Sequence, residues 1–415
     1  MSASAPSPRL SASPRPLAGI RVVDLTSVVV GPACTLRLAD FGAEVIKVEP
    51  PAGDVLRTLG GPSPGGHHAG SYLHLNRGKR AVGLDLKAPA ARAVLERLIA
   101  SSDVVVANMR PEALARLGLD ADGLRDRHPR LVHCTITGFG PGGPYRGRPA
   151  YDSVVQGVSG IAGLAERRDG RPLYVPLLLA DHVTGEIAAS AILAALVARE
   201  RTGLGATLEV PMHETMAAFV LQEHLGPRSF DPPLGPAGDA RVLNPDNRPL
   251  ATADGWISLT ANTDVQVQAF LRAVGRGDLI DDPRLRTVAD RFRHVELWFR
   301  VRAEALTSRT TADWLAVFAA ADVPAMPCHT LETLERDPHL AAVGLIGTDE
   351  HPTEGRVRTI RPTILQDGAP APVGRPAPPP GFDTRTVLRD LGFDEAERDA
   401  LIASGAAFEP GADTG

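Results

Sequence analysis

Five short runs typical of strands, separated by segments long enough for helices, constrain the fold of this chain more than any other feature. They are Ile20–Leu25, Ala43–Glu49, Ala81–Leu86, Asp103–Asn108 and Leu131–Thr137. Pro32 and Pro89 lie soon after the first and third runs, where the fixed φ of proline suits the first turn of a helix. Strands joined by helices in this way form right-handed crossovers within a mostly parallel sheet. We therefore predict an α/β fold with a large, open domain of the nucleotide-binding type.

The composition and the pattern of apolar residues change along the rest of the chain. A strongly apolar helix is predicted from Asp181 to about Glu200, followed by a strand at Ala206–Pro211. The stretch 226–249 is rich in proline and glycine, which marks a domain boundary. We predict a disordered tail at 1–16, the first part of the large domain at 17–225, a smaller and largely helical domain with a hairpin near Gly255 at 226–335, and a return segment at 336–415 that completes the large domain.

Composition excludes several classes of protein. The net charge of −5 argues against general binding to nucleic acid or to acidic membranes. No apolar run reaches the ~20 residues of a membrane span, and the Ser/Pro/Ala-rich start lacks the apolar core of an export signal. The three cysteines are far apart and form neither a CxxC pair nor a Cys/His zinc spacing. We expect a cytoplasmic protein without a metal site.

Basic residues recur in the first half of the chain. A solvated surface explains any one of them, but a group at the carboxyl ends of adjacent parallel strands could neutralise phosphates. The residues that we expect there are Arg77, Lys79 and Arg80, with Lys87, Arg110 and Arg116. The pattern indicates a ligand with several phosphate groups.

The segment GFGPGG at 138–143 formally fits the dinucleotide fingerprint G-x-G-x-x-G. That fingerprint requires a helix to open at the motif. Pro141 and Pro144 oppose such a helix, and the turn after the first run carries a single glycine. We interpret the segment as a glycine-rich loop, which argues against an NAD-dependent dehydrogenase.

Asp181 opens the long apolar helix in LLLADHVTGEIAAS. The simplest interpretation is a helix N-cap, for which aspartate is favoured. The same position also favours an ionised carboxylate, which can attack a thioester carbonyl. His182 is adjacent, but neighbours on a helix do not face each other, so an Asp-His dyad is not expected.

Ordered blocks through most of the chain resemble the class III CoA-transferase family. They include GPACTLRLADFGAEVIKVEPP, NRGKRAVGLDLK, ANMRPEALARLGL, ITGFGPGGPYRGRPAYDSVVQGVSG, LADHVTGEIAASAILAAL and TGLGATLEVPMHE. The family includes formyl-CoA transferase and carnitine CoA-transferase, with α-methylacyl-CoA racemase as a sister branch. The resemblance implies an enzyme that moves CoA between an acyl-CoA and a free carboxylic acid, with no permanently bound cofactor. It also implies an interlocked homodimer.

The resemblance also implies roles for individual residues. Asp181 matches the family's nucleophile, through which a covalent aspartyl intermediate would form. Val29 and Val30 match positions at the thioester end of CoA, and Arg148 and Tyr151 match a loop that contacts the pantetheine arm. The matches to the nucleotide end are Leu84, Lys87, Asn108, Met109, Arg110 and Arg116.

Three departures from the pattern of formyl-CoA transferase bear on specificity. Val29 stands where that enzyme has a glutamine at the reaction centre, and Pro50 replaces an arginine that contacts the nucleotide. Its four-glycine loop has no counterpart in NPDNRPLATADGWISL, the sequence around the predicted hairpin. An oxalate-type specificity is therefore not expected.

Two alternatives to CoA transfer remain open. The first is a racemase, whose branch has a histidine where this chain has Tyr151. A phenol is a poor base near neutral pH, which favours transfer, although the adjacent Asp152 could act as a base or as a partner of a loop amide. The second alternative is a non-catalytic CoA-binding protein, in which Asp181 would only cap its helix.

Overall fold

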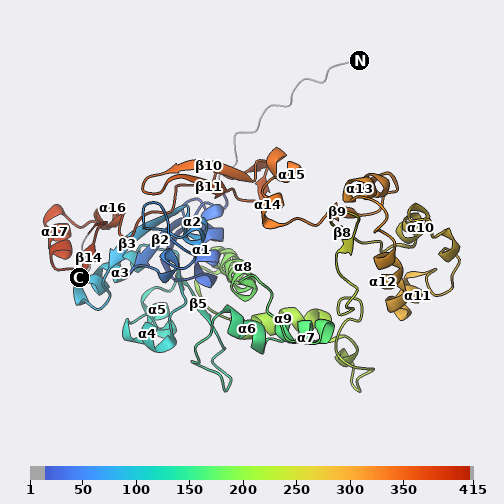
Figure 1. Ribbon diagram of the computed structural model, residues 1–415. Coiled ribbons are helices and arrows are strands. Elements are labelled where there is room, and N and C mark those ends of the chain that lie inside the picture. The colour runs from blue at the N-terminus through green and yellow to red at the C-terminus, as the bar shows by residue number, and fades with distance from the viewer. Residues whose placement is uncertain (1–14, 412–415) are drawn as a thin grey trace, which may run out of the picture. The chain divides into compact units, whose positions relative to one another are not determined.

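The computed structural model describes residues 15–411, which form two compact units (Figure 1). The first unit contains 15–159, 175–217 and 339–411, and the second contains 160–174 and 218–338. The domain division expected at 226 and 335 stays a prediction. Most of the expected disordered tail lies outside the described residues. Arg15 is placed, however: its Nη2 atom donates hydrogen bonds to the carbonyls of Ala39 and Asp40, so order begins before residue 17.

A seven-stranded sheet forms the centre of the first unit, in the order β14-β3-β2-β1-β4-β5-β6. All neighbouring pairs are parallel except β14 with β3. The strands are β1 (Arg21–Leu25), β2 (Glu44–Glu49), β3 (Lys79–Leu84), β4 (Val104–Ala107), β5 (Val132–Thr137), β6 (Ala206–Pro211) and β14 (Ala407–Phe408). The predicted α/β fold with a mostly parallel sheet is confirmed.

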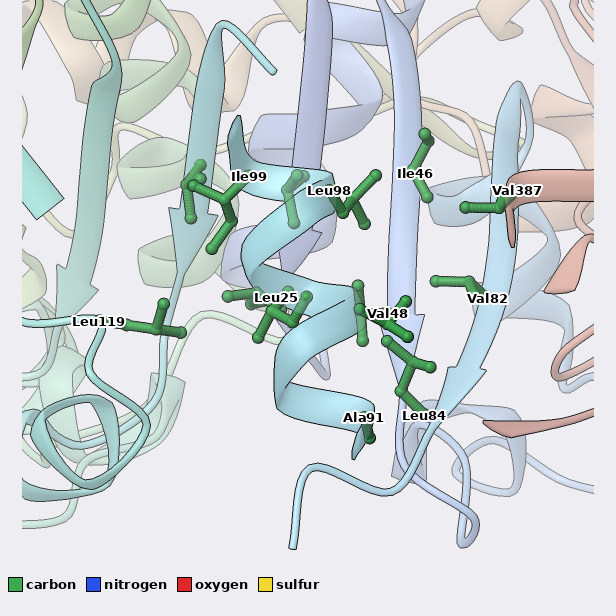
Figure 2. Packing of buried hydrophobic residues seen from close by; sticks show 14 of the residues in the cluster. Leu25, Ile46, Val48, Val82, Leu84, Ala91, Leu98, Ile99, Leu119 and Val387 are labelled. Carbon is green, nitrogen blue, oxygen red and sulfur yellow. The ribbon is translucent and has the colours of Figure 1, made fainter. Parts of the chain in front are cut away.

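Helix α3 (Pro89–Ala100) covers one region of this sheet (Figure 2). Pro89 occupies its first turn, as the sequence predicts. Leu98 and Ile99 are fully buried against strand residues that include Leu25 and Val48. Burial of one such side chain contributes roughly 1.5–3 kcal/mol, so this layer fixes the helix on the sheet.

Helices α1 (Val30–Asp40) and α8 (Leu179–Thr202) pack along each other. Gly185 makes this contact close, since a Cβ atom there would lie 2.7 Å from the carbonyl oxygen of Val30. By length and composition alone, α8 could cross a membrane, but half of its apolar stretch is buried inside the protein. We interpret α8 as a core helix.

The last elements of the described chain return to the first sheet. Helices α16 (Thr384–Asp390) and α17 (Glu395–Ala403) lead into β14, which lies beside β3 although the two strands are far apart in sequence (Figure 1). Gly83 allows this approach, because a Cβ atom there would lie 2.6 Å from the ring of Phe408. The edge of the sheet at β3 is thereby covered.

Shorter elements complete the first unit. They are α2 (Gly70–Asn76), α4 (Pro111–Arg116), α5 (Ala121–Arg127), α6 (Asp152–Val158), the 3-10 turn η1 (Val55–Arg57), and the strand pairs β10 (Ile346–His351) with β11 (Gly355–Ile360) and β12 (Leu365–Gln366) with β13 (Ala369–Pro370). Helix α9 (Met212–His224) begins in this unit, and α15 (Pro338–Ala342) ends in it.

The second unit has its own core. An antiparallel sheet of β7 (Leu250–Ala251), β8 (Trp256–Leu259) and β9 (Ala325–Pro327) packs with helices around Phe270, Trp298 and Phe318. The β7–β8 pair is the hairpin predicted near Gly255. The helices are α7 (Ile161–Asp169), α10 (Asp264–Ala273), α11 (Val288–Arg293), α12 (Val295–Glu304), α13 (Thr311–Ala320) and α14 (Leu331–Leu334), with 3-10 turns η2 (Gly226–Ser229) and η3 (Gly277–Leu279).

Candidate active site

Two adjoining cavities lie in the first unit, where the parallel strands end. The first has a volume of about 340 Å³ and the second about 560 Å³, and Ser27 and Met109 line both. Of the residues predicted from sequence, the first cavity gathers Val29, Val30, Asn108, Met109, Arg110, Arg148, Tyr151 and Asp181. The second gathers Leu84, Lys87, Met109 and Arg116. The fold thus brings these predicted site residues to two cavities that share part of their walls.

Asp181 lies in the first turn of α8 and is only 7% exposed. Its interpretation as the N-cap is wrong, because Leu178 holds that position. The Oδ1 atom of Asp152, from α6, accepts the amide hydrogens of Ala180 at 2.7 Å and Asp181 at 3.2 Å. The capping function is therefore supplied by another helix, and the Asp181 carboxylate is not engaged in capping.

The environment of Asp181 changes its acidity. Burial, followed by repulsion from the Asp152 carboxylate, raises the pKa of Asp181 to about 7. Both protonation states are then populated at neutral pH. A carboxylate of raised pKa is a more basic nucleophile than an exposed one, and perturbed pKa values of this kind are typical of functional sites.

Gln156 fixes the segment that leads into α8. Its Oε1 atom accepts the amide hydrogen of Val175 at 2.9 Å, and its Nε2 atom donates to the carbonyl of Leu177 at 3.0 Å and to Oδ2 of Asp152 at 2.7 Å. Asp152 was predicted as a possible partner of a loop amide, but the amides that it accepts belong to the first turn of α8. Because Asp152 is 5% exposed and both its oxygens are occupied, this environment does not favour Asp152 as a free base.

The turn between β1 and α1 forms the wall of the first cavity beside Asp181. Val28 has φ of +67°, a left-handed conformation that costs a β-branched residue roughly 1–2 kcal/mol. Asn108 binds this turn on both sides of Ser27, accepting from its amide at 3.0 Å and donating to its carbonyl at 2.9 Å. Asn108 was predicted to contact the nucleotide, but its amide group is used to hold the turn.

The second cavity offers cations for phosphates. Lys87 and Arg116 are exposed at its edge, and neither side chain has an ion-pair partner among residues 15–411. Leu84, at the end of β3, is fully buried and belongs to the apolar core beneath this cavity. This cavity could hold the phosphorylated end of a nucleotide.

The basic cluster at 77–80 is not part of the site, so this expectation is wrong. These residues lie at the amino end of β3, opposite the edge where ligands are expected. Lys79 is buried and bonds Asp24 at 3.1 Å, and Arg77 pairs with Asp40 at 2.6 Å. Arg80 pairs with Glu44 and Asp390. All three cations are neutralised within the protein.

Arg146 was missed by the sequence reasoning, although it is in the same RGR segment as Arg148. It lines the first cavity with Arg110 and Arg148. Within the described part of the chain, none of the three has a carboxylate partner, and Arg148 lies over the ring of Tyr145 at 4.9 Å. The cavity that holds Asp181 therefore has a surplus of positive charge.

The remaining wall of the first cavity is the glycine-rich loop after β5. No helix opens at Gly138–Gly143, as predicted: the next helix, α6, begins at Asp152. The amide of Gly140 donates to Glu214 at 2.9 Å, which fixes the loop. Tyr151 precedes α6, is 69% exposed and lines the cavity.

Comparison with known proteins agrees with this geometry. The family model for CoA-transferase family III matches residues 17–384. Succinate–glutarate CoA-transferase from Agrobacterium fabrum is 34% identical over 91% of this chain and 96% of its own length. Formyl-CoA:oxalate CoA-transferase from Escherichia coli is 30% identical over 93% of this chain and 98% of its own.

A solved structure supports the same assignment. The CaiB/BaiF family protein from Brucella suis matches with a TM-score of 0.76 and 30% identity, covering 91% of this chain and 100% of the other. The chain has the mixed α/β fold of that family, and its relatives are named as CoA-transferases. The protein belongs to CoA-transferase family III and is a CoA-transferase.

Proposed function

We propose that Asp181 is the nucleophile that carries CoA transfer in this enzyme. The observation that supports the proposal is the burial of its carboxylate in the wall of the first cavity, with its helix capped by Asp152. Among the described residues that line this cavity, the other carboxylate is Glu209, which is exposed and accepts a hydrogen bond from Thr137. A buried carboxylate is the better nucleophile, since water does not solvate it.

The reaction would proceed through covalent steps on Asp181. An ionised oxygen of Asp181 attacks the acyl-CoA carbonyl, the carbon–sulfur bond breaks, and an acyl-aspartyl anhydride and a CoA thiolate form. The thiolate attacks the aspartyl carbonyl, which releases the donor acid and leaves an aspartyl-CoA thioester. The acceptor carboxylate attacks this thioester, the carbon–sulfur bond breaks, and a second mixed anhydride and a CoA thiolate form. The thiolate then attacks the acyl carbon of the acceptor and displaces the Asp181 carboxylate. New acyl-CoA leaves, and Asp181 is ionised again.

Mass spectrometry after incubation with acyl-CoA and hydroxylamine tests the proposal. Hydroxylamine should convert Asp181 into its hydroxamate only when acyl-CoA is present. Asp181→Ala should show no adduct and no CoA exchange, whereas the control Glu209→Gln should retain both. Exchange by Asp181→Ala at a rate near that of the wild type would remove Asp181 from the mechanism.

We also propose that the exchanged acids are dicarboxylic. Several relatives are named for succinate and glutarate, each of which carries two carboxylates. One carboxylate reacts at Asp181, and the second needs a cation in the same cavity. Arg146 is free for this role, because Arg110 and Arg148 match contacts to CoA itself. A charge-assisted pair between Arg146 and the distal carboxylate would select such acids.

Comparison of succinate with butyrate as acceptors tests this specificity, since the two acids have the same chain length. Arg146→Ala should raise the KM for succinate at least tenfold and leave the slower transfer to butyrate unchanged. The matched control Arg148→Ala should affect both acids alike, through CoA. Equal transfer to the two acids by the wild type would contradict the dicarboxylate assignment and leave the role of Asp181 intact.

We further propose a cytoplasmic, interlocked homodimer, in which the first unit is the large domain and the second the small one. Exposed apolar side chains of the first unit support an interface, among them Leu177, Leu178, Ile187 and Val197. Isolated soluble monomers rarely expose a large apolar patch. Native mass spectrometry should give twice the chain mass at nanomolar concentration, and a monomer there would contradict the proposal.

A further inference from the structure

The turn that carries Val29 and Val30 is held in an unfavourable shape. Val28 has φ of +67°, which a β-branched residue rarely adopts. Val28, Val29 and Val30 line the same cavity as Asp181. A strained conformation persists only where its surroundings impose it, and such residues cluster at functional sites.

Asp54 imposes this conformation from a different loop. Its Oδ1 atom accepts the amide hydrogen of Val28 at 3.0 Å and that of Leu56 at 3.0 Å. Its own amide donates to Glu49 at 2.9 Å, so the position of Asp54 is itself fixed to the end of β2. The side chain is 1% exposed. The Val28 amide thus points to a rigid, buried acceptor.

Lys47, on β2, completes the arrangement. Its ammonium group lies 2.9 Å from Oδ2 of Asp54 and donates to the carbonyl of Thr26 at 2.7 Å. Burial opposes the charge of Lys47, but the carboxylates of Asp24 and Asp54 outweigh it and raise the pKa of Lys47. The charged pair therefore holds the turn at Thr26 and at Val28, one residue on each side of Ser27.

Asp54 also lines the second cavity, together with Lys87 and Arg116. Its carboxylate lies between the space for the nucleotide and the turn beside Asp181. We infer that Asp54, with Lys47, is a positioning pair that sets the β1–α1 turn so that a bound thioester meets Asp181. The inference rests on the proposed role of Asp181, and it adds two residues that do not themselves contact the reacting atoms.

We expect a substitution of Asp54 to change kcat much more than the affinity for CoA. Loss of the Val28 hydrogen bond should let the turn relax, and a misplacement of about 1 Å can lower a rate by 10²-fold. CoA affinity should change little, because Lys87 and Arg116, the cations expected to hold its phosphates, belong to elements other than the turn. Asp54→Ala should therefore lower kcat 10- to 100-fold and change the Kd for CoA less than threefold.

A matched control variant and a second-site rescue distinguish a loss of positioning from a general loss of stability. Asp40 also forms a buried ion pair, with Arg77 at 2.6 Å, but it lines neither cavity. Asp40→Ala should lose comparable stability and keep kcat. Glycine tolerates positive φ, so adding Val28→Gly to Asp54→Ala should recover part of the lost rate. A loss of kcat equal to that of Asp40→Ala, or no recovery with Val28→Gly, would overturn the inference.

Asp54→Asn provides the same comparison if Asp54→Ala does not fold. An amide cannot direct oxygen atoms at both the Lys47 ammonium and the Val28 amide, so kcat should fall more than threefold at unchanged Kd. The rate of hydroxamate formation at Asp181 separates the two proposals. No adduct in the wild type would refute the nucleophile, whereas an adduct forming equally fast in the wild type and the Asp54 variants would refute only the positioning pair.

Discussion

The Oδ1 atom of Asp152 accepts a hydrogen bond from the backbone amide of Asp181 at 3.2 Å, so one aspartate holds the peptide of another. The same contact brings two carboxylates into one buried region, which contributes to the raised pKa of Asp181. Asp152 therefore has two separable effects, one through hydrogen bonding and one through charge. Substitutions that keep the first and remove the second can distinguish them.

Asp152→Asn should shift the pH dependence of acylation to lower pH. Through Oδ1, asparagine can still accept the two amide hydrogens, although its Nδ2 cannot accept from Gln156. Its neutral group no longer repels charge on Asp181, so the pKa of Asp181 falls. Hydroxamate formation measured across the neutral range should show a wild-type midpoint near 7 and a lower midpoint in the variant. Asp152→Ala should also lose about 1 kcal/mol of stability with the cap. An unchanged midpoint would contradict the proposed repulsion between the carboxylates of Asp152 and Asp181.

Asp181→Asn should make the protein more stable above pH 7. In the folded wild type the pKa of Asp181 is raised to about 7 from 3.8, so ionisation favours unfolding. The stability present below about pH 4 is lost progressively as pH rises to about 7, by up to about 4 kcal/mol. Urea denaturation at about pH 8 should show the gain in the variant, and the gain should disappear near about pH 4. Equal stability at both pH values would contradict the raised pKa.

Lys87→Ala and Arg116→Ala should weaken CoA binding without slowing the chemical step. Both cations lie in the second cavity, away from Asp181. Loss of one charge-assisted phosphate contact removes roughly 1.5–3 kcal/mol, so the Kd for CoA should rise at least tenfold. Acyl-pantetheine, which lacks the nucleotide, provides the control: both variants should use it as the wild type does. A change confined to kcat would contradict this placement.

Gly185→Ala should reduce kcat by separating α8 from the β1–α1 turn. The added methyl would lie 2.7 Å from the Val30 carbonyl oxygen and 3.0 Å from Cβ of Ala33. Gly163, in α7, has open space around it, since a methyl group added there would meet nothing within 4 Å. Gly163→Ala should therefore be neutral or slightly stabilising. Steady-state kinetics and thermal unfolding of both variants test the difference. A fully active Gly185→Ala enzyme would show that the spacing of α1 and α8 is not critical.

Local sequence patterns predicted the parallel strands of the large sheet but not its antiparallel strand β14. The runs around Val23, Ile46 and Val105 are short and rich in valine and isoleucine, as is typical of buried parallel strands, and these strands were found within about two residues. Strand β14 is two residues long and carries no such pattern. Its place beside β3 depends on the fit of Phe408 against Gly83, a contact that no local window contains.

The active site also contains features that local sequence predicts and features that depend on long-range contacts. Asp181 was predicted as the nucleophile because its segment matches that of the family, but the residue that caps its helix is Asp152, 29 positions earlier, which no pattern indicated. Lys79 was misjudged for the opposite reason. A run of cations suggests a surface, whereas the structure pairs Lys79 with Asp24, which lies far away in the sequence but close in the sheet. Long-range charge pairing cannot be read from composition.

The antiparallel pairing of β14 with β3 has a consequence for biosynthesis. Until the ribosome has made Ala407 and Phe408, the backbone groups of β3 at that edge have no strand to bind. An unpaired edge readily recruits other strands. Nascent chains, and products shortened before residue 407, should therefore depend on chaperones more than the full-length protein does. Synthesis of Ala407 and Phe408, rather than synthesis of α8, would then mark the point at which this edge of the large sheet is covered.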